Sequence, residues 1–133
     1  MTVYVLDTNV VSDIAAPKIN LKVRGKFTLY RQHTLCLYEA VDYEIRRGYL
    51  KSAASTRMRA YEEQLMPLFE WVPVTNTDWL LAAQYWAQTK IIGKQLSDVD
   101  LLIAAVATRL NAVIVSAEAD FDVLPVIRED WRQ

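Results

Sequence analysis

The sequence predicts an α/β domain with a mainly parallel central sheet flanked by helices. Short apolar runs rich in β-branched residues recur along the chain, and longer segments with helical periodicity separate them. Strands that alternate with helices pair in parallel through right-handed crossovers. With 133 residues, 53% of them hydrophobic, the chain suits one folded domain over residues 1–133 with a core of its own.

Two strands and their helices are predicted in the first part of the chain. The β-branched run at 3–6 forms the first strand, and a helix capped by Thr8 or Asn9 follows it to about Ala16, where Pro17 interrupts it. The next elements are a helix at 19–31, a strand at 34–38, a helix from there to about Lys51, and a helix at 53–69 that Pro67 ends or kinks.

The remaining elements follow the same alternation. A short strand at 70–74 is limited by Pro73, and Thr77 caps a helix that runs to about Lys90. Trp79 and Trp86 lie on that helix at helical spacing with apolar neighbours. Exposed tryptophans would stack on nucleobases, but this apolar stripe favours packing in the core. The last elements are a nearly all-apolar helix at 98–110, a strand at 112–116 and a further strand at 123–127.

Several classes of protein are disfavoured by composition. No apolar stretch is long enough to span a membrane, and no signal peptide precedes the first apolar run. The single cysteine, Cys36, cannot form an internal disulfide and lies in an apolar run, which favours a core position. We therefore expect a cytoplasmic protein without a membrane partner.

Basic residues concentrate in the first part of the chain. Residues 1–60 hold ten Lys and Arg against five Asp and Glu, whereas residues 61–133 hold five against eleven. No acid lies between Asp13 and Glu39, where the five cations are Lys18, Lys22, Arg24, Lys26 and Arg31. Two interpretations stay open: a patch that faces phosphates, or the solvated face of an amphipathic helix.

Two acids stand where a plain fold does not need them. Asp7 ends the first strand, at the sheet edge where ligands bind in parallel sheets, although it also suits a helix N-cap. Ser97 and Asp100 have the spacing of a capping box. Asp100, however, shares a helical face with Ile103 and Ala107, and a carboxylate facing the interior is costly without a cation or hydrogen-bond donors.

A third acid, Glu44, borders the apolar stripe of the helix after the second strand. It therefore lies beside buried surface, unless it is exposed and paired with Arg47. Gly48, one turn further on, suggests close packing or access to a site, because glycine destabilises a helix by about 1 kcal/mol relative to alanine. Glu39 and Asp42 project elsewhere, and we expect both to be solvated.

The strand at 112–116 is followed by a fourth acidic group. Ser116, Glu118 and Asp120 lie at the same sheet edge, where a solvated turn is the simpler interpretation. If the acids converge, their repulsion and hard oxygen atoms favour Mg²⁺ or Mn²⁺, since one histidine and one cysteine supply no zinc site. Such a site suits metal-dependent hydrolysis of phosphodiesters in nucleic acid.

Four segments together resemble the PIN-domain ribonucleases, in particular the VapC-like toxins of type II toxin–antitoxin pairs. They are "VLDTNVVSD", "YEIRRGYL", "SDVDLLIAAVA" and "AVIVSAEADF", in the family's order and over nearly the whole chain. The resemblance implies a PIN fold, dependence on Mg²⁺ or Mn²⁺, cleavage of RNA such as tRNA or another structured RNA, inhibition by a cognate antitoxin, and a homodimer.

The resemblance also implies roles for individual residues. Asp7, Glu44 and Asp100 match the first three metal acids, with Asp98 a nearby contributor and Asp120 or Glu118 the fourth acid. Thr8, Asn9 and Ser116 match positions that hold water or phosphate. The cations expected to meet RNA phosphates or antitoxin acids are Arg46, Arg47 and the segment Lys18–Arg31, which includes Lys22 and Lys26.

Two other function classes compete with a nuclease. A catalytically degenerate PIN-like interaction module would keep its acids only as helix caps, and the intact set of Asp7, Glu44 and Asp100 argues against it. A phosphatase with an aspartate nucleophile needs a second aspartate two residues later, where this chain has Asn9. Three glycines cannot supply a dinucleotide-binding G-x-G-x-x-G motif after the first strand.

Overall fold

A five-stranded, all-parallel sheet forms the centre of the computed structural model, which describes residues 1–16 and 20–133. The predicted α/β class is therefore confirmed. The strands are β1 (Val3–Leu6), β2 (Thr34–Tyr38), β3 (Glu70–Val72), β4 (Val113–Val115) and β5 (Ile127–Glu129). The α-helices are α1 (Thr8–Ala15), α2 (Leu21–Tyr30), α3 (Glu39–Lys51), α4 (Ser55–Ala60), α5 (Asn76–Ile91) and α6 (Asp98–Leu110).

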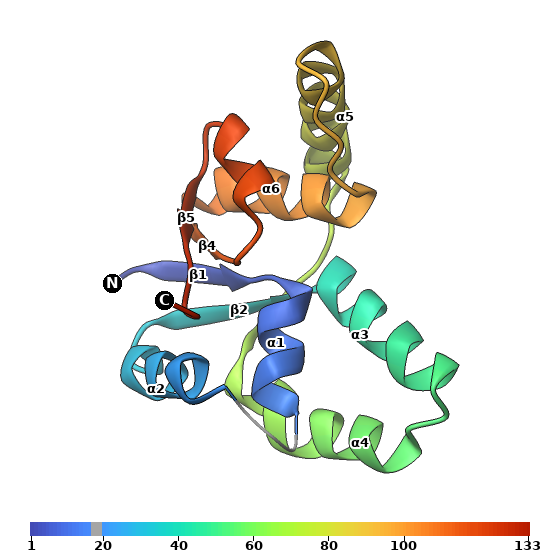
Figure 1. Cartoon of the computed structure of the whole chain (residues 1–133), viewed down its shortest axis with the longest axis vertical. Coiled ribbons are helices and arrows are strands. Elements are labelled where there is room, and N and C mark those ends of the chain that lie inside the picture. Colours follow the sequence, from blue (N-terminus) through green and yellow to red (C-terminus); the bar gives the residue numbers. More distant parts are fainter. Residues whose placement is uncertain (17–19) are drawn as a thin grey trace.

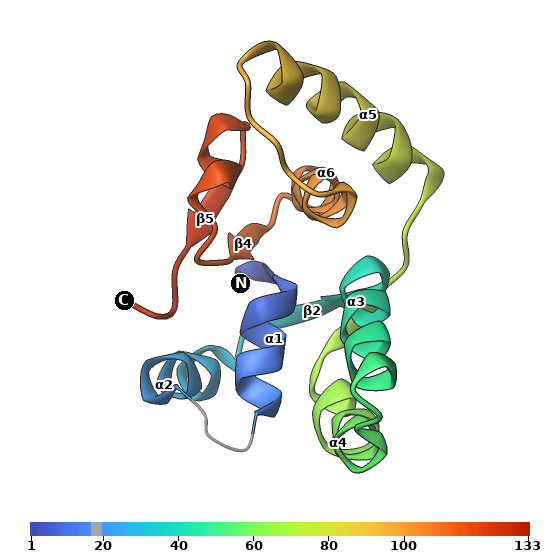
Figure 2. The same cartoon turned by 45° about the vertical axis from the view of Figure 1, so that its right-hand side comes forward.

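The order of the strands places a crevice beside the central strand. The order is β3-β2-β1-β4-β5, with Val5 opposite Cys36 on one side and Ile114 on the other. The chain runs outward from β1 through β2 to β3 and then crosses back to β4 on the other side of β1, so helices α1 to α4 lie on one face and α5 and α6 on the other (Figures 1 and 2). Ligands bind at such a switch point, beyond the carboxyl ends of β1 and β4.

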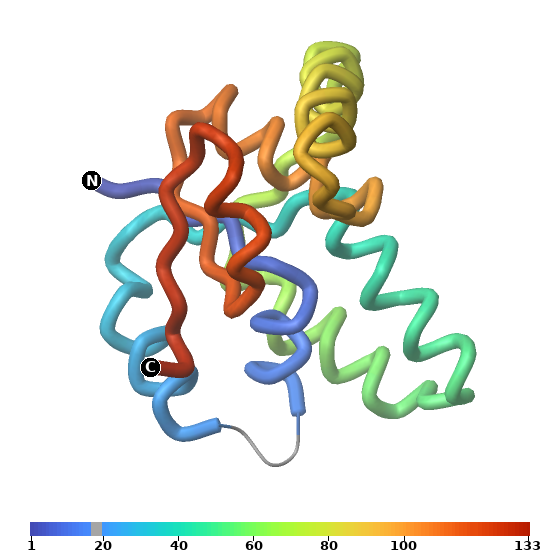
Figure 3. The backbone as a smooth tube through the Cα atoms, turned by 45° about the horizontal axis from the view of Figure 1, so that its top comes forward, coloured from blue at the N-terminus to red at the C-terminus, as the bar shows by residue number. Residues whose placement is uncertain are grey.

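The core lies against both faces of the sheet. Helix α6 is buried from Leu101 to Ala107, as its apolar composition predicts, and Cys36 is buried in β2. The last residues return to the N-terminal half of the chain (Figure 3), where Trp131 packs on the rings of Tyr4 and Tyr30. No helix in the described ranges is both long enough and apolar enough to cross a membrane.

Several element boundaries differ from the predictions. The first helix has Asp7 as its N-cap instead of Thr8 or Asn9, and α5 is capped by Thr75, not Thr77, because Thr75 and Asp78 form a reciprocal capping box. The predicted helix at 53–69 is instead α4 followed by a π-helical turn and a 3₁₀ turn that contains Pro67. The predicted interruption at Pro17 lies outside the described residues.

The last predicted strand is also displaced along the chain. A 3₁₀ turn occupies Ala119–Val123, so the strand predicted at 123–127 forms at Ile127–Glu129. This turn carries the chain from β4 to β5, which pair in parallel. The connection therefore needs residues that the sequence pattern had assigned to a strand.

Helix α5 packs through a different face from the one predicted. Trp79 and Trp86 are 56% and 49% exposed, whereas Ala82, Tyr85 and Thr89 are buried. Helix α5 packs closely on α6, and it stands away from the sheet in Figure 2. The small Ala82 allows the close approach, so the bulky indoles point outward.

Two buried carboxylates hold the helices together. Asp78 is completely buried and accepts hydrogen bonds from Arg109 and from the Tyr38 hydroxyl. Asp42, expected to be solvated, is instead buried and accepts hydrogen bonds from Tyr61 and Arg46. The sequence pattern failed for Asp42 because Tyr61, which covers it, comes from the segment after α4, and local spacing does not reveal that contact.

Candidate functional site

A polar hollow of about 350 Å³ opens at the carboxyl ends of β1 and β4. Three of the predicted metal acids, Asp7, Glu44 and Asp100, line it. The other lining residues are Thr8, Asn9, Arg47, Ser97 and Glu118. Parallel strands bring these segments to one edge, although the residues are up to 111 positions apart from Asp7 to Glu118.

Asp7 lies at the base of this hollow. It follows β1, is 6% exposed, and makes no side-chain capping hydrogen bond to α1. The Ser116 hydroxyl donates to Asp7 Oδ2 at 2.5 Å, and the Glu118 backbone N–H donates to Ser116 Oγ at 2.9 Å. Burial raises the pKa of Asp7, and the hydrogen bond from Ser116 only partly opposes the rise. The completely buried Ser116 thus positions Asp7.

Glu44 faces the same hollow from the second turn of α3. Its Oε1 accepts a hydrogen bond from the Thr8 hydroxyl at 2.5 Å, and its Oε2 accepts one from Arg47 at 3.2 Å. The predicted pairing with Arg47 and the position beside the site therefore both occur. Gly48 is not explained by close packing, since a Cβ there would meet nothing within 4 Å.

Asp100 completes the acidic set from the first turn of α6. Ser97 Oγ accepts a hydrogen bond from the Asp100 backbone N–H at 3.1 Å, which fixes the start of the helix. Burial, together with the charges of Asp7 and Glu44, raises the pKa of Asp100 to about 6. The three carboxylates therefore repel one another and favour a proton or a cation in the hollow. Sequence reasoning treated Ser97 as a cap alone, and its capping spacing gave no sign that it lines the hollow.

The structure places other predicted site residues elsewhere. Asp98 is exposed and lines neighbouring hollows, and Asp120 lies 3.5 Å from Lys94 as an ion pair. Of the two candidates for the fourth acid, Glu118 is the one that lines the site. Arg46 pairs with Asp42 and Glu62. Lys22 and Lys26 lie on α2 and do not line the hollow, and Lys18 falls outside the described residues.

The donor atoms of the hollow suit a hard divalent cation. Within residues 1–16 and 20–133, no three acidic, histidine or cysteine side chains are grouped closely enough to hold a metal ion by themselves. Mg²⁺ is commonly held by one or two carboxylates and keeps several waters. The all-oxygen set of Asp7 and Asp100, with Glu44 nearby, fits that requirement and offers no nitrogen or sulfur ligand for zinc.

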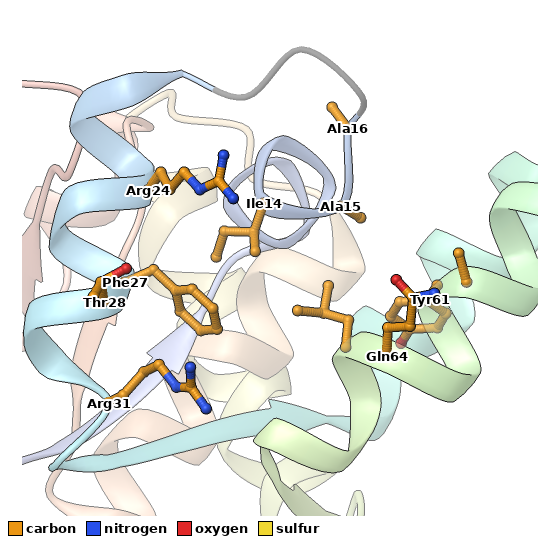
Figure 4. Close-up of a pocket in the computed structure, with 11 residues that line it drawn as sticks. Ile14, Ala15, Ala16, Arg24, Phe27, Thr28, Arg31, Tyr61 and Gln64 are labelled. Atoms are coloured by element: carbon orange, nitrogen blue, oxygen red, sulfur yellow. The ribbon is translucent and has the colours of Figure 1, made fainter.

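A separate hollow of about 390 Å³ lies between α1, α2 and residues 60–65. Figure 4 shows Arg24 and Arg31 on either side of Phe27, with Ile14 facing them from α1. The Arg31 guanidinium lies 5.9 Å from the centre of the Phe27 ring. This hollow thus combines apolar surface with two cations, which suits a partner with acidic and apolar side chains.

Comparisons with known proteins point to one fold, that of the PIN domain. A model of the PIN domain family matches residues 4–127. FitAcB from Neisseria gonorrhoeae is 22% identical, covers 96% of this chain and 97% of its own, and superposes with a TM-score of 0.85. DNA-bound VapBC from Salmonella typhimurium is 25% identical, covers 98% of this chain and 99% of its own, and also has a TM-score of 0.85.

A third similar structure is that of VapC20 from Mycobacterium tuberculosis, described as a toxin that cleaves the sarcin-ricin loop. It is 12% identical, covers 93% of this chain and 96% of its own, and has a TM-score of 0.75. At this identity the similarity shows a shared fold. A search of curated protein sequences returned no match.

Proposed function

Because this chain belongs to the PIN domain family, we propose that it is a VapC-like toxin, an endoribonuclease that depends on Mg²⁺ or Mn²⁺ and that a cognate antitoxin inhibits. The observation that carries the proposal is the convergence of Asp7, Glu44 and Asp100 on one hollow, with the pKa of Asp7 and Asp100 raised. We propose tRNA or another structured RNA as the substrate. Similar folds in VapBC and FitAcB support the antitoxin partner.

In this mechanism Asp7 and Asp100 would hold the cation, with Glu44 as the third carboxylate of the hollow. When bound, the cation activates water and stabilises the charge that develops in the in-line displacement at phosphorus. Ser116 donates to Oδ2 of Asp7, and this hydrogen bond fixes the direction of the carboxylate. Thr8 and Arg47 hold both oxygens of Glu44 in the same way.

Arg47 is the positively charged side chain in the lining of the hollow, and it is available to the RNA backbone. Its side chain is 57% exposed, and its guanidinium has donors beyond the one used by Glu44. An arginine in this position binds a phosphate oxygen and offsets the repulsion between RNA and the carboxylates. Arg46 is already paired with two acids, so we assign it to the stability of α3.

The basic residues of α2 suit the antitoxin better than the cleavage site. Arg24 on α2 and Arg31, which directly follows α2, border the separate hollow of Figure 4, which does not include the carboxylates. Acidic and apolar side chains of an antitoxin would fit there. We also propose that the protein forms a homodimer. This part of the proposal is based only on the resemblance to the family.

Cleavage of total tRNA by the purified, antitoxin-free protein tests this function. We expect discrete fragments with Mg²⁺ or Mn²⁺ and none with a chelator, resolved on a denaturing gel. Ribosomal RNA in parallel separates the two substrate classes. A folded protein that binds RNA but cuts neither RNA with either metal would favour the catalytically degenerate interaction module.

Asp100→Asn is expected to stabilise the metal-free protein at pH 7 while it abolishes cleavage. The pKa of Asp100 is raised to about 6, so the folded state binds a proton more tightly than the unfolded state does. The free energy of unfolding therefore falls as the pH rises from about 4 to 6, and the loss persists at pH 7. After allowance for solvent and for the lost helix-dipole interaction, the gain is about 1 kcal/mol.

Urea denaturation with chelator at pH 4 and pH 7 measures this effect. The wild-type protein should lose more stability between the two values than Asp100→Asn does. Asp98→Asn is the matched control, because Asp98 lies in the same helical turn but outside the hollow. An equal pH dependence for wild type and Asp100→Asn would contradict the assignment.

Neutralising Lys22 and Lys26 tests whether α2 contacts RNA. Lys22 is exposed, and Lys26 Nζ lies 5.5 Å from the centre of the Tyr30 ring. If each lysine binds one phosphate, Lys22→Gln with Lys26→Gln should reduce the slope of log K against log salt by about 1.4 for single-stranded RNA. Filter binding over a salt series measures the slope, with exposed Lys51→Gln and Arg59→Gln as control. An unchanged slope would remove α2 from the RNA interface.

A further inference from the structure

A hollow of about 500 Å³ adjoins the carboxylate site and shares one residue with it. The shared residue is Arg47, which lines both spaces. The second hollow lies between α3, α5 and the start of α6, and its lining includes Tyr43, Arg47, Val74, Trp79, Asp98 and Leu102. The two hollows therefore meet at Arg47.

Two aromatic side chains give this hollow its character. Tyr43 from α3 is 58% exposed, and Trp79 from α5 is 56% exposed. The Arg47 guanidinium lies 5.1 Å from the centre of the Tyr43 ring and also donates to Glu44 Oε2 at 3.2 Å. The same cation thus lies against an aromatic ring on one side and touches the acidic cluster on the other.

We propose that this hollow binds one unstacked nucleobase of an RNA strand whose neighbouring phosphate lies at the carboxylate site. The inference rests on the proposed ribonuclease function and names a specificity subsite for it. Proteins bind single-stranded RNA by stacking its bases on aromatic rings and on the plane of arginine. Trp79, Tyr43 and Arg47 supply those surfaces beside the point of cleavage.

The polar groups of the hollow favour a base over a second copy of the chain. Asp98 is exposed in this hollow, and Glu39, also in the lining, accepts a hydrogen bond from the Val74 backbone N–H. The cores of protein interfaces are depleted of charged residues. A carboxylate instead accepts hydrogen bonds from the N–H donors on the edge of an unpaired base, which every RNA base supplies through an amino or ring N–H group.

Trp86 supplies an internal comparison on the same helix. It is 49% exposed, and Lys90 Nζ lies 5.4 Å from its ring centre, much as a cation accompanies Tyr43. Trp86 lines other hollows on α5 but not the one that contains Arg47. Its removal therefore tests the general effect of losing an exposed indole from α5.

The test compares wild type, Trp79→Ala and Trp86→Ala on a short single-stranded RNA that contains the mapped cleavage site. We expect kcat/KM to fall roughly 5- to 100-fold for Trp79→Ala, the range for loss of one base stack, and by less than about twofold for Trp86→Ala. An abasic nucleotide at one position beside the cut should slow the wild type by about as much as Trp79→Ala does. The same abasic nucleotide should not slow Trp79→Ala any further. Equal sensitivity of both proteins to every abasic position would overturn the subsite.

Further measurements separate this inference from the proposed function. Cleavage by the wild type tests the function, whereas the difference between Trp79→Ala and Trp86→Ala tests the subsite. If the wild type cuts no RNA, quenching of tryptophan fluorescence by the same oligonucleotide tests the subsite directly. The quenching should be weaker in Trp79→Phe than in the wild type and unchanged in Trp86→Phe. Equal quenching in both variants would overturn the proposal. Sedimentation velocity showing that Trp79→Ala alone dissociates a dimer would assign the hollow to a second copy and also overturn it.

Discussion

Asp7→Asn is expected to lower RNA cleavage by about 10³-fold or more, because the substitution removes a charge that holds the cation and leaves its neighbours in place. Asparagine has nearly the same shape, and its side-chain oxygen is able to accept the Ser116 hydrogen bond that Asp7 accepts now. The pKa of Asp7 is raised by burial, so loss of the charge is not expected to destabilise the fold. Single-turnover cleavage with Mn²⁺ measures the loss.

Asp13→Asn is the control for this variant. Asp13 lies on the same helix, α1, pairs with Arg132 and does not line the hollow. It should cut RNA at the wild-type rate, and both variants should show the wild-type circular dichroism spectrum. Wild-type cleavage by Asp7→Asn would contradict the site assigned to the acids.

Asp78→Ala is expected to lower the free energy of unfolding by about 3 kcal/mol, the lower end of the range for breaking a buried ion pair. Asp78 is completely buried, and Arg109 donates to both its oxygens, at 2.7 and 3.0 Å. The substitution leaves the guanidinium and the Tyr38 hydroxyl without their acceptor. These contacts join α5 to α6 and β2, so their loss weakens the support of α6 and hence of Asp100.

The pH dependence of Asp78 has the opposite sign from that of Asp100. Burial alone would raise the pKa of Asp78, but hydrogen bonds from Arg109, the Thr75 backbone and Tyr38 lower it below the ordinary value. Its contribution is therefore present above the unfolded pKa near 3.9 and is lost as the pH falls through the lower folded value. The difference between wild type and Asp78→Ala should shrink in acid.

Urea denaturation at pH 7 and below pH 4 measures both effects. Asp122→Ala is the control, because Asp122 also receives two hydrogen bonds from one arginine, Arg128, but its side chain is 54% exposed. An exposed pair of this kind contributes about 0 to 1 kcal/mol. If Asp78→Ala costs no more than Asp122→Ala, the buried network does not support the fold.

The sequence predicted those parts of the molecule that follow from local pattern. β1 and β2 form at the predicted residues, and the helix predicted at 98–110 forms as Asp98–Leu110. Convergence of Asp7, Glu44 and Asp100 was also predictable, because parallel strands and the helices between them bring such positions to one sheet edge.

The sequence could not predict contacts that depend on which face meets a neighbour. Trp79 and Trp86 have the period of a buried stripe, but the close packing of α5 on α6 uses the smaller Ala82. Asp42 looks solvated on its own helix and is buried only because Tyr61 returns to it from a later segment. Position along the chain likewise did not distinguish Glu118, which lines the hollow, from Asp120, which pairs with Lys94.

The most direct measurement of the central claim is a crystal structure with Mn²⁺, using anomalous scattering to locate the metal. We predict an anomalous peak in the hollow at about 2.0 to 2.2 Å from carboxylate oxygens of Asp7 and Asp100, close to the distances of Mg²⁺ sites. The peak should be absent from Asp7→Asn crystals grown in the same way. Wild-type crystals at millimolar Mn²⁺ with no peak between these carboxylates would contradict the account.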